Sequence, residues 1–300
     1  MVSVIIPTYN YGRFIGRALN SVLSQSYQDY EIIIVDDAST DNTKDIIGQY
    51  NDPRIKYLQH KVNGGPGKAR NTGIEESKGM YIAFLDSDDT WMPEKIESQI
   101  EVFRNGSDNL GLVYTNMEIF NDTTLKTSSA SFSGYHGQVL QHLLEANHVG
   151  NSGVMIKKKC FADTGLFDVS MRGCEDWEMW IRVACLYLFD CIDQPLFTLT
   201  IHSSSSSAIS KTMISGREML LQKHFALYRQ YPDIHSLQYY ILGIQCFKEA
   251  MMTRGRKHFL NSFRYSDPGD ISIRCRAIMQ ILASAAGFKG YTRIKRRLGF

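Results

Sequence analysis

Short apolar runs alternate with segments of helical periodicity in the first third of the chain. Residues 2–6, 31–35 and 81–85 are apolar runs that predict buried strands, and residues 55–58 predict a further strand. Residues 13–25 carry apolar side chains on one face and predict an amphipathic helix. Strands and helices that alternate in this way form βαβ units. We therefore expect an α/β fold with a mainly parallel, twisted sheet that helices cover on both faces.

The pattern changes twice further along the chain. After Gly106 it loosens, with strands expected at 112–115, 117–120, 153–156 and 196–201, and helices at 139–146 and 173–183. After Ile209 it is helical, with helices expected at 217–230, 238–254 and 271–287 and no strand signals. We therefore divide the chain into residues 1–105, residues 106–210 of the same domain, and a helical C-terminal region at 211–300.

Composition excludes several classes of protein. A hydrophobic content of 43% and a charged content of 21% are ordinary for a globular chain with a sizeable core. The six cysteines show neither a Cys-x-x-Cys pair nor zinc-finger spacing, so we expect reduced and mostly buried thiols. The first apolar run stops at Pro7 and reads as a strand, not an export signal, and no run reaches the roughly 20 apolar residues of a membrane span. These features favour a cytoplasmic protein.

Three carboxylates stand in the stretch Asp86-Ser87-Asp88-Asp89, directly after the fourth predicted strand. Open α/β sheets bind ligands at the carboxyl ends of their strands. Carboxylate oxygens suit Mg²⁺ or Mn²⁺, which usually also takes phosphate oxygens from a substrate. The stretch therefore indicates a metal–diphosphate site. The alternative is a solvated acidic turn that caps the helix expected from Pro93.

Two other nucleotide-binding folds do not fit the motifs. A dinucleotide-binding Rossmann domain needs G-x-G-x-x-G after the first strand, and this turn holds a proline and the single glycine Gly12. A P-loop ATPase needs G-x-x-x-x-G-K-[ST], which does not occur in the sequence.

Five motifs, in order and at matching spacing, resemble those of the family 2 inverting glycosyltransferases, which have the GT-A nucleotide-diphospho-sugar transferase fold. The motifs are VIIPTYN at 4–10, IVDDASTD at 34–41, GKARNTG at 67–73, FLDSDD at 84–89 and Glu175-Asp176-Trp177. Each motif is weak alone and the set is specific. The resemblance covers about residues 1–205, and the remaining residues match no motif of the family.

The resemblance implies a role for each matching residue. A donor nucleotide site would be lined by Pro7, Thr8, Tyr9, Asp37, Lys68, Arg70 and Ser87. Asp86, Asp88 and His202 would form the site for Mn²⁺ or Mg²⁺, with His202 near the donor phosphates. Asp176 would be the general base, and Glu175 is the alternative base.

Plain structural roles stand beside these functional ones. Tyr9 could be a core aromatic, Asp37 a helix cap and Arg70 a solvated helix residue. Asp176 could be a charge that favours the first turn of a helix. The chain also departs from the family pattern, because Thr200 stands where members often carry an arginine two residues before the histidine.

The resemblance implies metal-dependent, inverting transfer of a sugar from a nucleotide diphosphate sugar, UDP-linked, to a glycan or lipid-linked acceptor, as in cell-surface polysaccharide synthesis. Residues 1–105 would bind the nucleotide sugar and residues 106–210 the acceptor. One alternative is a sugar-1-phosphate nucleotidylyltransferase, which needs a glycine-rich loop that Pro7-Thr8-Tyr9-Asn10 does not supply. The other alternative is a sugar-nucleotide-binding protein without transferase activity.

Residues 271–300 contain seven basic residues and no acidic one, interleaved with apolar residues. The basic residues are Arg274, Arg276, Lys289, Arg293, Lys295, Arg296 and Arg297. This pattern indicates an interfacial helix that contacts the inner face of the cell membrane peripherally. The alternative is a helix packed on the catalytic domain with a solvated basic tail. We expect no nucleic-acid partner, and we read the serine run 203–207 as a mobile loop.

Overall fold

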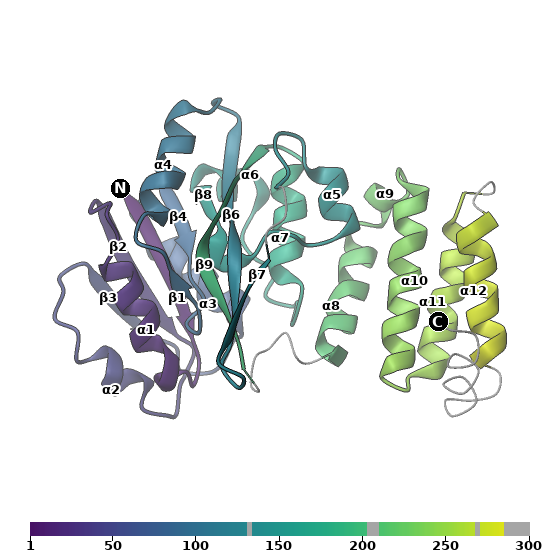
Figure 1. Ribbon diagram of the computed structural model, residues 1–300, viewed down its shortest axis with the longest axis horizontal. Helices are drawn as coiled ribbons and strands as arrows, with labels where there is room; N and C mark the ends of the chain where they lie inside the picture. Colours follow the sequence, from purple (N-terminus) through teal and green to yellow (C-terminus); the bar gives the residue numbers. More distant parts are fainter. Residues whose placement is uncertain (131–133, 203–209, 268–270, 285–300) are drawn as a thin grey trace. The chain divides into compact units, whose positions relative to one another are not determined.

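The protein, shown as a computed structural model in Figure 1, divides into two compact units. The structure describes residues 1–130, 134–202, 210–267 and 271–284. One unit comprises Met1–Ser170 and Glu175–Ser205, and the other comprises Met171–Cys174 and Ser206–Phe300. None of the helices in these described ranges has the length and apolar character needed to cross a bilayer.

The first unit contains all the strands of the described residues. Its elements are, in chain order, β1 (Val2–Thr8), α1 (Gly12–Leu23), β2 (Tyr30–Asp36), α2 (Thr43–Ile47), β3 (Ile55–Gln59), α3 (Pro66–Glu76), β4 (Tyr81–Phe84), β5 (Thr90–Trp91), α4 (Lys95–Asn105), β6 (Leu110–Asn121), β7 (Lys126–Ala130), α5 (Leu140–Glu145), η1 (Asn151–Gly153), β8 (Met155–Lys157), α6 (Lys159–Thr164), α7 (Glu175–Ala184) and β9 (Leu188–Ile201).

These strands form one sheet in the order β3-β2-β1-β4-β8-β6-β9-β5, with β7 paired to β6. Neighbouring strands from β3 to β4 are all parallel. Strand β8 then enters antiparallel to both β4 and β6, and β9 runs parallel to β6. The predicted α/β class is confirmed, and the continuously parallel part of the sheet lies in its first half.

Strand β2 shows how the apolar pattern covers the sheet on both faces. Ile32 and Ile34 join the core cluster that contains apolar residues of α1 and α4. Ile33 and Val35 point the other way and pack with Ala69 of α3. Because successive side chains of a strand alternate between faces, an unbroken apolar run must be buried on both sides.

The structure corrects three expected boundaries. Residues 110–121 form the single strand β6 where two strands were predicted, and β9 begins at Leu188, eight residues before its predicted start at 196. The single helix predicted at 238–254 is wrong. The chain turns after Lys248, with Ala250 in the left-handed region at φ 59°, so two helices replace one.

The second unit is helical over its described residues. Its helices are α8 (Ser210–Lys223), α9 (Phe225–Tyr228), α10 (Pro232–Lys248), α11 (Met252–Tyr265) and α12 (Ile271–Ser284). Phe247, Phe259 and Ala277 form its core cluster. A Cβ atom on Gly255 would lie 2.2 Å from the Phe247 ring, so this glycine lets α10 and α11 pack closely.

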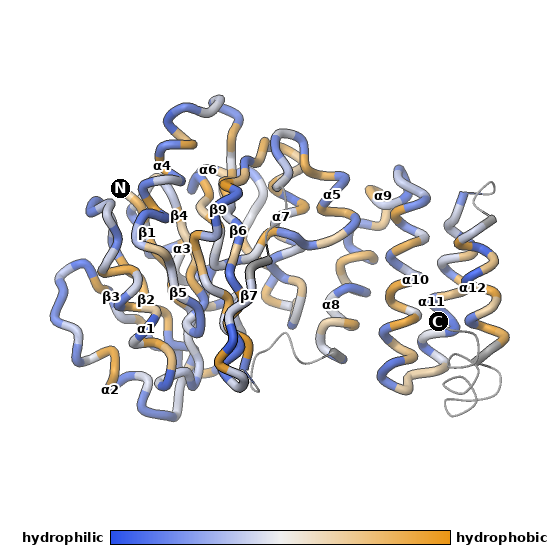
Figure 2. The backbone as a smooth tube through the Cα atoms, viewed as in Figure 1, coloured by the Kyte–Doolittle hydropathy of each residue, from blue (hydrophilic) through white to orange (hydrophobic). Residues whose placement is uncertain are grey.

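The predicted basic segment is only partly described. Hydrophobic and hydrophilic segments alternate along α12 (Figure 2), where Ala277 is buried and Leu282 is 68% exposed. Lys289, Arg293, Lys295, Arg296 and Arg297 lie outside the described residues, as does the serine run at 203–207.

A buried polar network connects α4 with the segment before β8. The Lys95 side chain is fully buried, its Nζ donates to Gln99 Oε1 at 2.7 Å, and it lies 4.1 Å from the centroid of the Trp91 ring. Gln99 in turn donates to the carbonyls of Val113 and Gly153. The network therefore fixes η1, whose other residues reach the carboxylates that follow β4.

Lys95 gives the unfolding free energy a testable dependence on pH. Burial lowers the pKa of Lys95 well below its ordinary value of 10.5. Between the lowered pKa and 10.5 the unfolded chain binds more protons than the folded one. Stability should therefore rise with pH across this window, by up to about 1.4 kcal/mol per pH unit.

Urea unfolding at pH 7 and pH 9 measures this effect. We expect Lys95→Met to flatten the rise in stability and Lys44→Met, at an exposed position of α2, to leave it unchanged. Equal slopes for the wild type and Lys95→Met would contradict the assignment.

Candidate active site

The carboxyl ends of four strands bring the predicted site residues to one edge of the sheet. Thr8 ends β1, Asp37 follows β2, and Asp86 follows β4, and these three strands are parallel. His202 follows β9, which runs in the same direction as β4 because two antiparallel pairings and one parallel pairing separate them. This edge is where open α/β sheets bind ligands.

Asp37 anchors the loop that leads into α3. Its carboxylate accepts hydrogen bonds from the backbone N–H of Gly64 at 2.9 and 3.0 Å and of Gly65 at 2.6 Å, and it contacts His60 Nδ1 at 2.7 Å. Gly65 has φ 87°, a conformation that glycine adopts without strain. Asp37 does not cap α2 in this arrangement. A nucleotide base would share the Asp37 oxygens with this loop.

Arg70 of α3 bridges two carboxylates from distant parts of the chain. Its Nη2 donates to Asp86 Oδ1 at 2.8 Å and its Nη1 donates to Glu175 Oε1 at 2.9 Å. The residue is only 5% exposed, so the solvated reading of Arg70 is wrong. The bridge ties the loop after β4 to the first turn of α7.

Asp176 is half-buried next to this bridge. Its Oδ2 accepts a hydrogen bond from Asn147 Nδ2 at 3.2 Å, and its Oδ1 accepts one from the backbone N–H of Trp177 at 2.7 Å. Burial and the charge of Glu175 raise the pKa of Asp176 to about 6, against the opposing effect of Arg70. A carboxylate with this pKa is a suitable proton acceptor near neutral pH.

Asp88 pairs with His202 across the same edge. Asp88 Oδ2 lies 3.0 Å from His202 Nε2, and the His202 side chain is 3% exposed. The His202 ring stacks on Phe14 of α1 with centroids 4.5 Å apart, and Tyr11 meets it edge-on at 5.6 Å. These contacts fix the imidazole beside the carboxylate.

Asp89 has a structural position in the acidic stretch. It is 2% exposed, its Oδ1 accepts a hydrogen bond from the backbone N–H of Thr200 at 2.9 Å, and its Oδ2 accepts one from Ser152 Oγ at 2.5 Å. Asp89 therefore fastens the loop after β4 to β9 and η1. The contact uses the backbone of Thr200, so it does not depend on the side chain at that position.

The remaining predicted nucleotide-binding residues differ in exposure. Pro7 and Thr8 are buried in β1, and Ser87 is 4% exposed. Tyr9 is 43% exposed, so it is not a core aromatic, and Lys68 is exposed on α3. Only Tyr9 and Lys68 of this set offer a side chain freely to a ligand.

Sequence reasoning missed three residues before β8 that contact the site carboxylates. Asn147 reaches Asp176, Asn151 Nδ2 donates to Asp86 Oδ1 at 3.0 Å, and Ser152 contacts the loop at two points. The signal was the polar, glycine-containing stretch at 147–153 directly before the apolar run of β8.

The predicted metal ligands Asp86, Asp88 and His202 all lie at this edge of the sheet. Among the described residues, no group of three or more His, Cys, Asp or Glu side chains is arranged to hold a metal ion. Asp88 and His202 form a two-residue donor set, and Asp86 is engaged by Arg70 through Oδ1. Mg²⁺ is usually bound through one or two carboxylates and substrate phosphates. Burial and the neighbouring Asp86 also raise the pKa of Asp88, and a cation would relieve this crowding of charge. The residues therefore fit an ion that arrives with a diphosphate.

Solved structures share this fold. The crystal structure of Staphylococcus aureus TarS 1-349 in complex with UDP-GlcNAc has a TM-score of 0.70 and 18% sequence identity, covering 99% of this chain and 92% of that chain. The mannosyltransferase PcManGT of Pyrobaculum calidifontis, in complex with GDP-Man and Mn²⁺, has a TM-score of 0.60 and 15% identity, covering 95% of this chain and 80% of that chain. At these identities the likeness shows the fold alone.

Sequence comparison adds the family. A curated relative, the Escherichia coli UDP-Glc:alpha-D-GlcNAc-diphosphoundecaprenol beta-1,3-glucosyltransferase WfgD, is 39% identical over 125 residues, which is 42% of this chain and 49% of the relative. The chain spans 31% to 40% of the length of the first four curated relatives that it matches. The family model described as "Glycosyl transferase family 2" matches residues 3–161, which is more than half of the chain. The chain therefore belongs to glycosyltransferase family 2.

Proposed function

We propose that this protein transfers a sugar from a UDP-linked donor to a glycan or lipid-linked acceptor, with inversion at the anomeric carbon and with Mn²⁺ or Mg²⁺ at the donor phosphates. The observation that carries the proposal is the position of Asp176. Its carboxylate has a pKa of about 6, and the residue before it, Glu175, is linked through Arg70 to Asp86 in the acidic loop after β4. Proton acceptor and phosphate site thus share one edge of the sheet.

The donor site is proposed at the ends of β1 and β2. The exposed ring of Tyr9 can stack on a base, and the exposed Lys68 can approach a phosphate. Support for a uridine nucleotide comes from the UDP-GlcNAc bound by TarS and from the UDP-Glc in the name of WfgD.

Asp88 and His202 would hold the metal ion, and Asp86 would stand beside it with its Oδ1 fixed by Arg70 and Asn151. The Mn²⁺ in the PcManGT complex supports this proposal. When bound, a divalent ion neutralises the charge that develops on the leaving diphosphate. Arg70 is already paired with Asp86 and Glu175, so its positive charge is largely compensated within the protein.

Asp176 would take the proton of the acceptor hydroxyl as that oxygen attacks the anomeric carbon. One displacement from the face opposite the nucleotide inverts the configuration and needs no protein nucleophile. Glu175 is less suited to be the base, because its carboxylate is paired with Arg70 and largely buried. A positioned base typically contributes about 10²–10⁴-fold to the rate.

The acceptor side is proposed from the second half of the first unit, residues 106–210, where Asn147 meets Asp176. A lipid-linked acceptor has support from the diphosphoundecaprenol acceptor in the name of WfgD. The peripheral membrane contact through residues 271–300 is part of this proposal.

Replacing the proposed base tests the proton transfer. We expect Asp176→Asn to keep the affinity for UDP within about twofold and to lower kcat by at least 10²-fold, because the amide keeps the shape and cannot accept the proton. Turnover of a radiolabelled UDP-sugar and calorimetric UDP binding measure the two quantities. A near-normal kcat would remove Asp176 from the mechanism.

The pH profile tests the same group independently. Because Asp176 acts as a carboxylate with a raised pKa of about 6, kcat should fall about tenfold per pH unit below pH 6 and level off above it. The residual rate of Asp176→Asn should lack this acidic limb. An acidic limb of the same position in the variant would assign it to another group.

The metal site is tested by calorimetric UDP titration with and without Mn²⁺. We expect Asp88→Asn to abolish the gain in UDP affinity that Mn²⁺ confers and to leave metal-free UDP binding unchanged. Asp45→Asn, an exposed carboxylate of α2, is the matched control and should behave like the wild type. Activity that survives EDTA undiminished would exclude the metal role.

A further inference from the structure

The first unit has a pocket at the end of β4 opposite the acidic loop. The pocket has a volume of about 1050 Å³. It includes Tyr81, the first residue of β4, whereas Asp86 lies just after the last residue of this strand. Its apolar lining includes Ile74 and Phe161, which are buried, and Met80, which is 69% exposed. Ligand pockets are typically about 300–1,000 Å³ with a mainly apolar lining.

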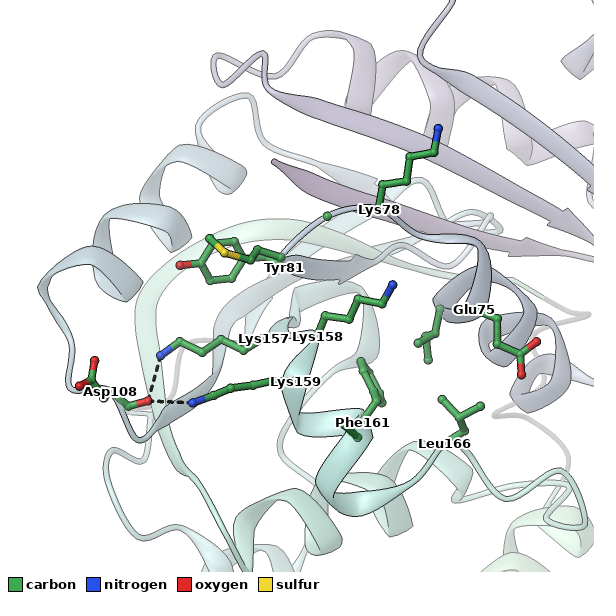
Figure 3. Close-up of a pocket in the computed structure, with 13 residues that line it drawn as sticks. Glu75, Lys78, Tyr81, Asp108, Lys157, Lys158, Lys159, Phe161 and Leu166 are labelled. Atoms are coloured by element: carbon green, nitrogen blue, oxygen red, sulfur yellow. Dashed lines mark hydrogen bonds between the residues drawn. The ribbon is translucent and has the colours of Figure 1, made fainter.

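Four lysines also line the pocket: Lys78, Lys157, Lys158 and Lys159. Figure 3 shows Lys157 and Lys159 extending together toward Asp108. Lys158 Nζ donates to the carbonyl of Ser77 at 2.6 Å. Lys157 and Lys159 donate to the same carbonyl, that of Asp108, at 3.1 and 3.4 Å (Figure 3). Main-chain carbonyls thus hold three ammonium groups at the pocket without neutralising their charge.

The pocket lining carries an excess of positive charge. It has four lysines and two acidic residues, Glu75 and Asp108, a net charge of 4 − 2 = +2. Among the described residues, no carboxylate lies within ion-pair distance of any of the four ammonium groups. Burial and the charge of Lys159 lower the pKa of Lys157, against the opposing effect of Asp108. Crowded cations beside an apolar lining indicate a missing anion.

We propose that this pocket binds an organic anion in which a phosphate group is attached to an apolar chain. The phosphate would lie among the ammonium groups, each of which has unused N–H donors. The apolar chain would cover Met80, which is 69% exposed, and the half-buried Leu166. A free phosphate would leave these two side chains in water, and an uncharged lipid would leave the excess positive charge of the lysines uncompensated.

The site is separate from the proposed transferase site, because the two lie at opposite ends of β4. None of the pocket residues belongs to the acidic loop, the Arg70 bridge or the start of α7. Ligand binding here and donor turnover can therefore be measured independently.

Calorimetry on the full chain tests the proposal with three probes. Dihexanoylphosphatidic acid below its critical micelle concentration carries both features, dihexanoylphosphatidylcholine has the same chains without net charge, and inorganic phosphate has no chain. We expect the phosphatidic acid to bind at least tenfold more tightly than either other probe. Equal affinity for the two lipids, or for phosphatidic acid and phosphate, would overturn the proposal.

Matched variants locate the binding. The double variant Lys78→Gln/Lys159→Gln should weaken binding of the phosphatidic acid at least tenfold. The control variant Lys44→Gln/Lys126→Gln removes the same charge at exposed positions elsewhere and should leave this binding unchanged. Equal weakening by both pairs would overturn the site. Hydrogen exchange of the wild type gives an independent readout. The ligand should slow exchange in residues 74–81 and 157–162. Slower exchange confined to other segments would contradict the proposal.

Vesicle flotation distinguishes the source of the ligand. Binding both to the monomeric probe and to vesicles that contain phosphatidic acid assigns the pocket to a bilayer lipid. Binding to the monomeric probe alone assigns it to a soluble phosphorylated compound of the same chemistry. Binding to neither overturns the proposal.

Discussion

The site depends on one buried guanidinium, that of Arg70, held between Asp86 and Glu175. The two carboxylates lie 16 and 105 residues away from it in the chain, and each belongs to a different part of the site. Removing one partner from a buried ion pair typically costs about 3–5 kcal/mol, because the other charge stays desolvated. The bridge therefore makes the acidic loop after β4 and the first turn of α7 a single unit. Because it engages Glu175 and leaves the half-buried Asp176 without a direct ion pair, it supports the proposal that Asp176 is the base.

Much of the first half of the fold follows from local sequence. The segments 2–6, 31–35, 55–58 and 81–85 each became a strand of the parallel part of the sheet. Strands β1, β2 and β4 are buried on both faces, as an apolar run requires, whereas β3 at the edge of the sheet is only half-buried. The position of Asp86 and Asp88 after β4 follows from the same reasoning. The antiparallel entry of β8 does not, because strand direction is set by the path of the chain between strands.

Side-chain partners were less predictable than elements. Arg70 was expected to face the nucleotide, and the structure shows it bound to two carboxylates, one of them more than a hundred residues distant. Asp89 stands in the same acidic stretch as Asp88, and only its contacts with Thr200 and Ser152 show that its position is structural. Such pairings depend on tertiary contacts that no local pattern encodes.

Charge is also segregated along β4. Carboxylates crowd its carboxyl end, where burial and mutual repulsion raise the pKa values of Asp88 and Asp89. Lysines crowd its amino end, where Lys157 has a lowered pKa. This segregation of charge is the basis for the two proposed sites, the cation site at one end and the organic-phosphate pocket at the other.

The configuration of the released sugar tests the central claim most directly. At a high concentration of enzyme, water can replace the acceptor and hydrolyse a UDP-α-sugar. Proton NMR then follows the anomeric proton of the free sugar before it mutarotates. A single displacement assisted by Asp176 predicts that the β-anomer appears first. Initial release of the α-anomer would contradict the account, because retention requires a second displacement.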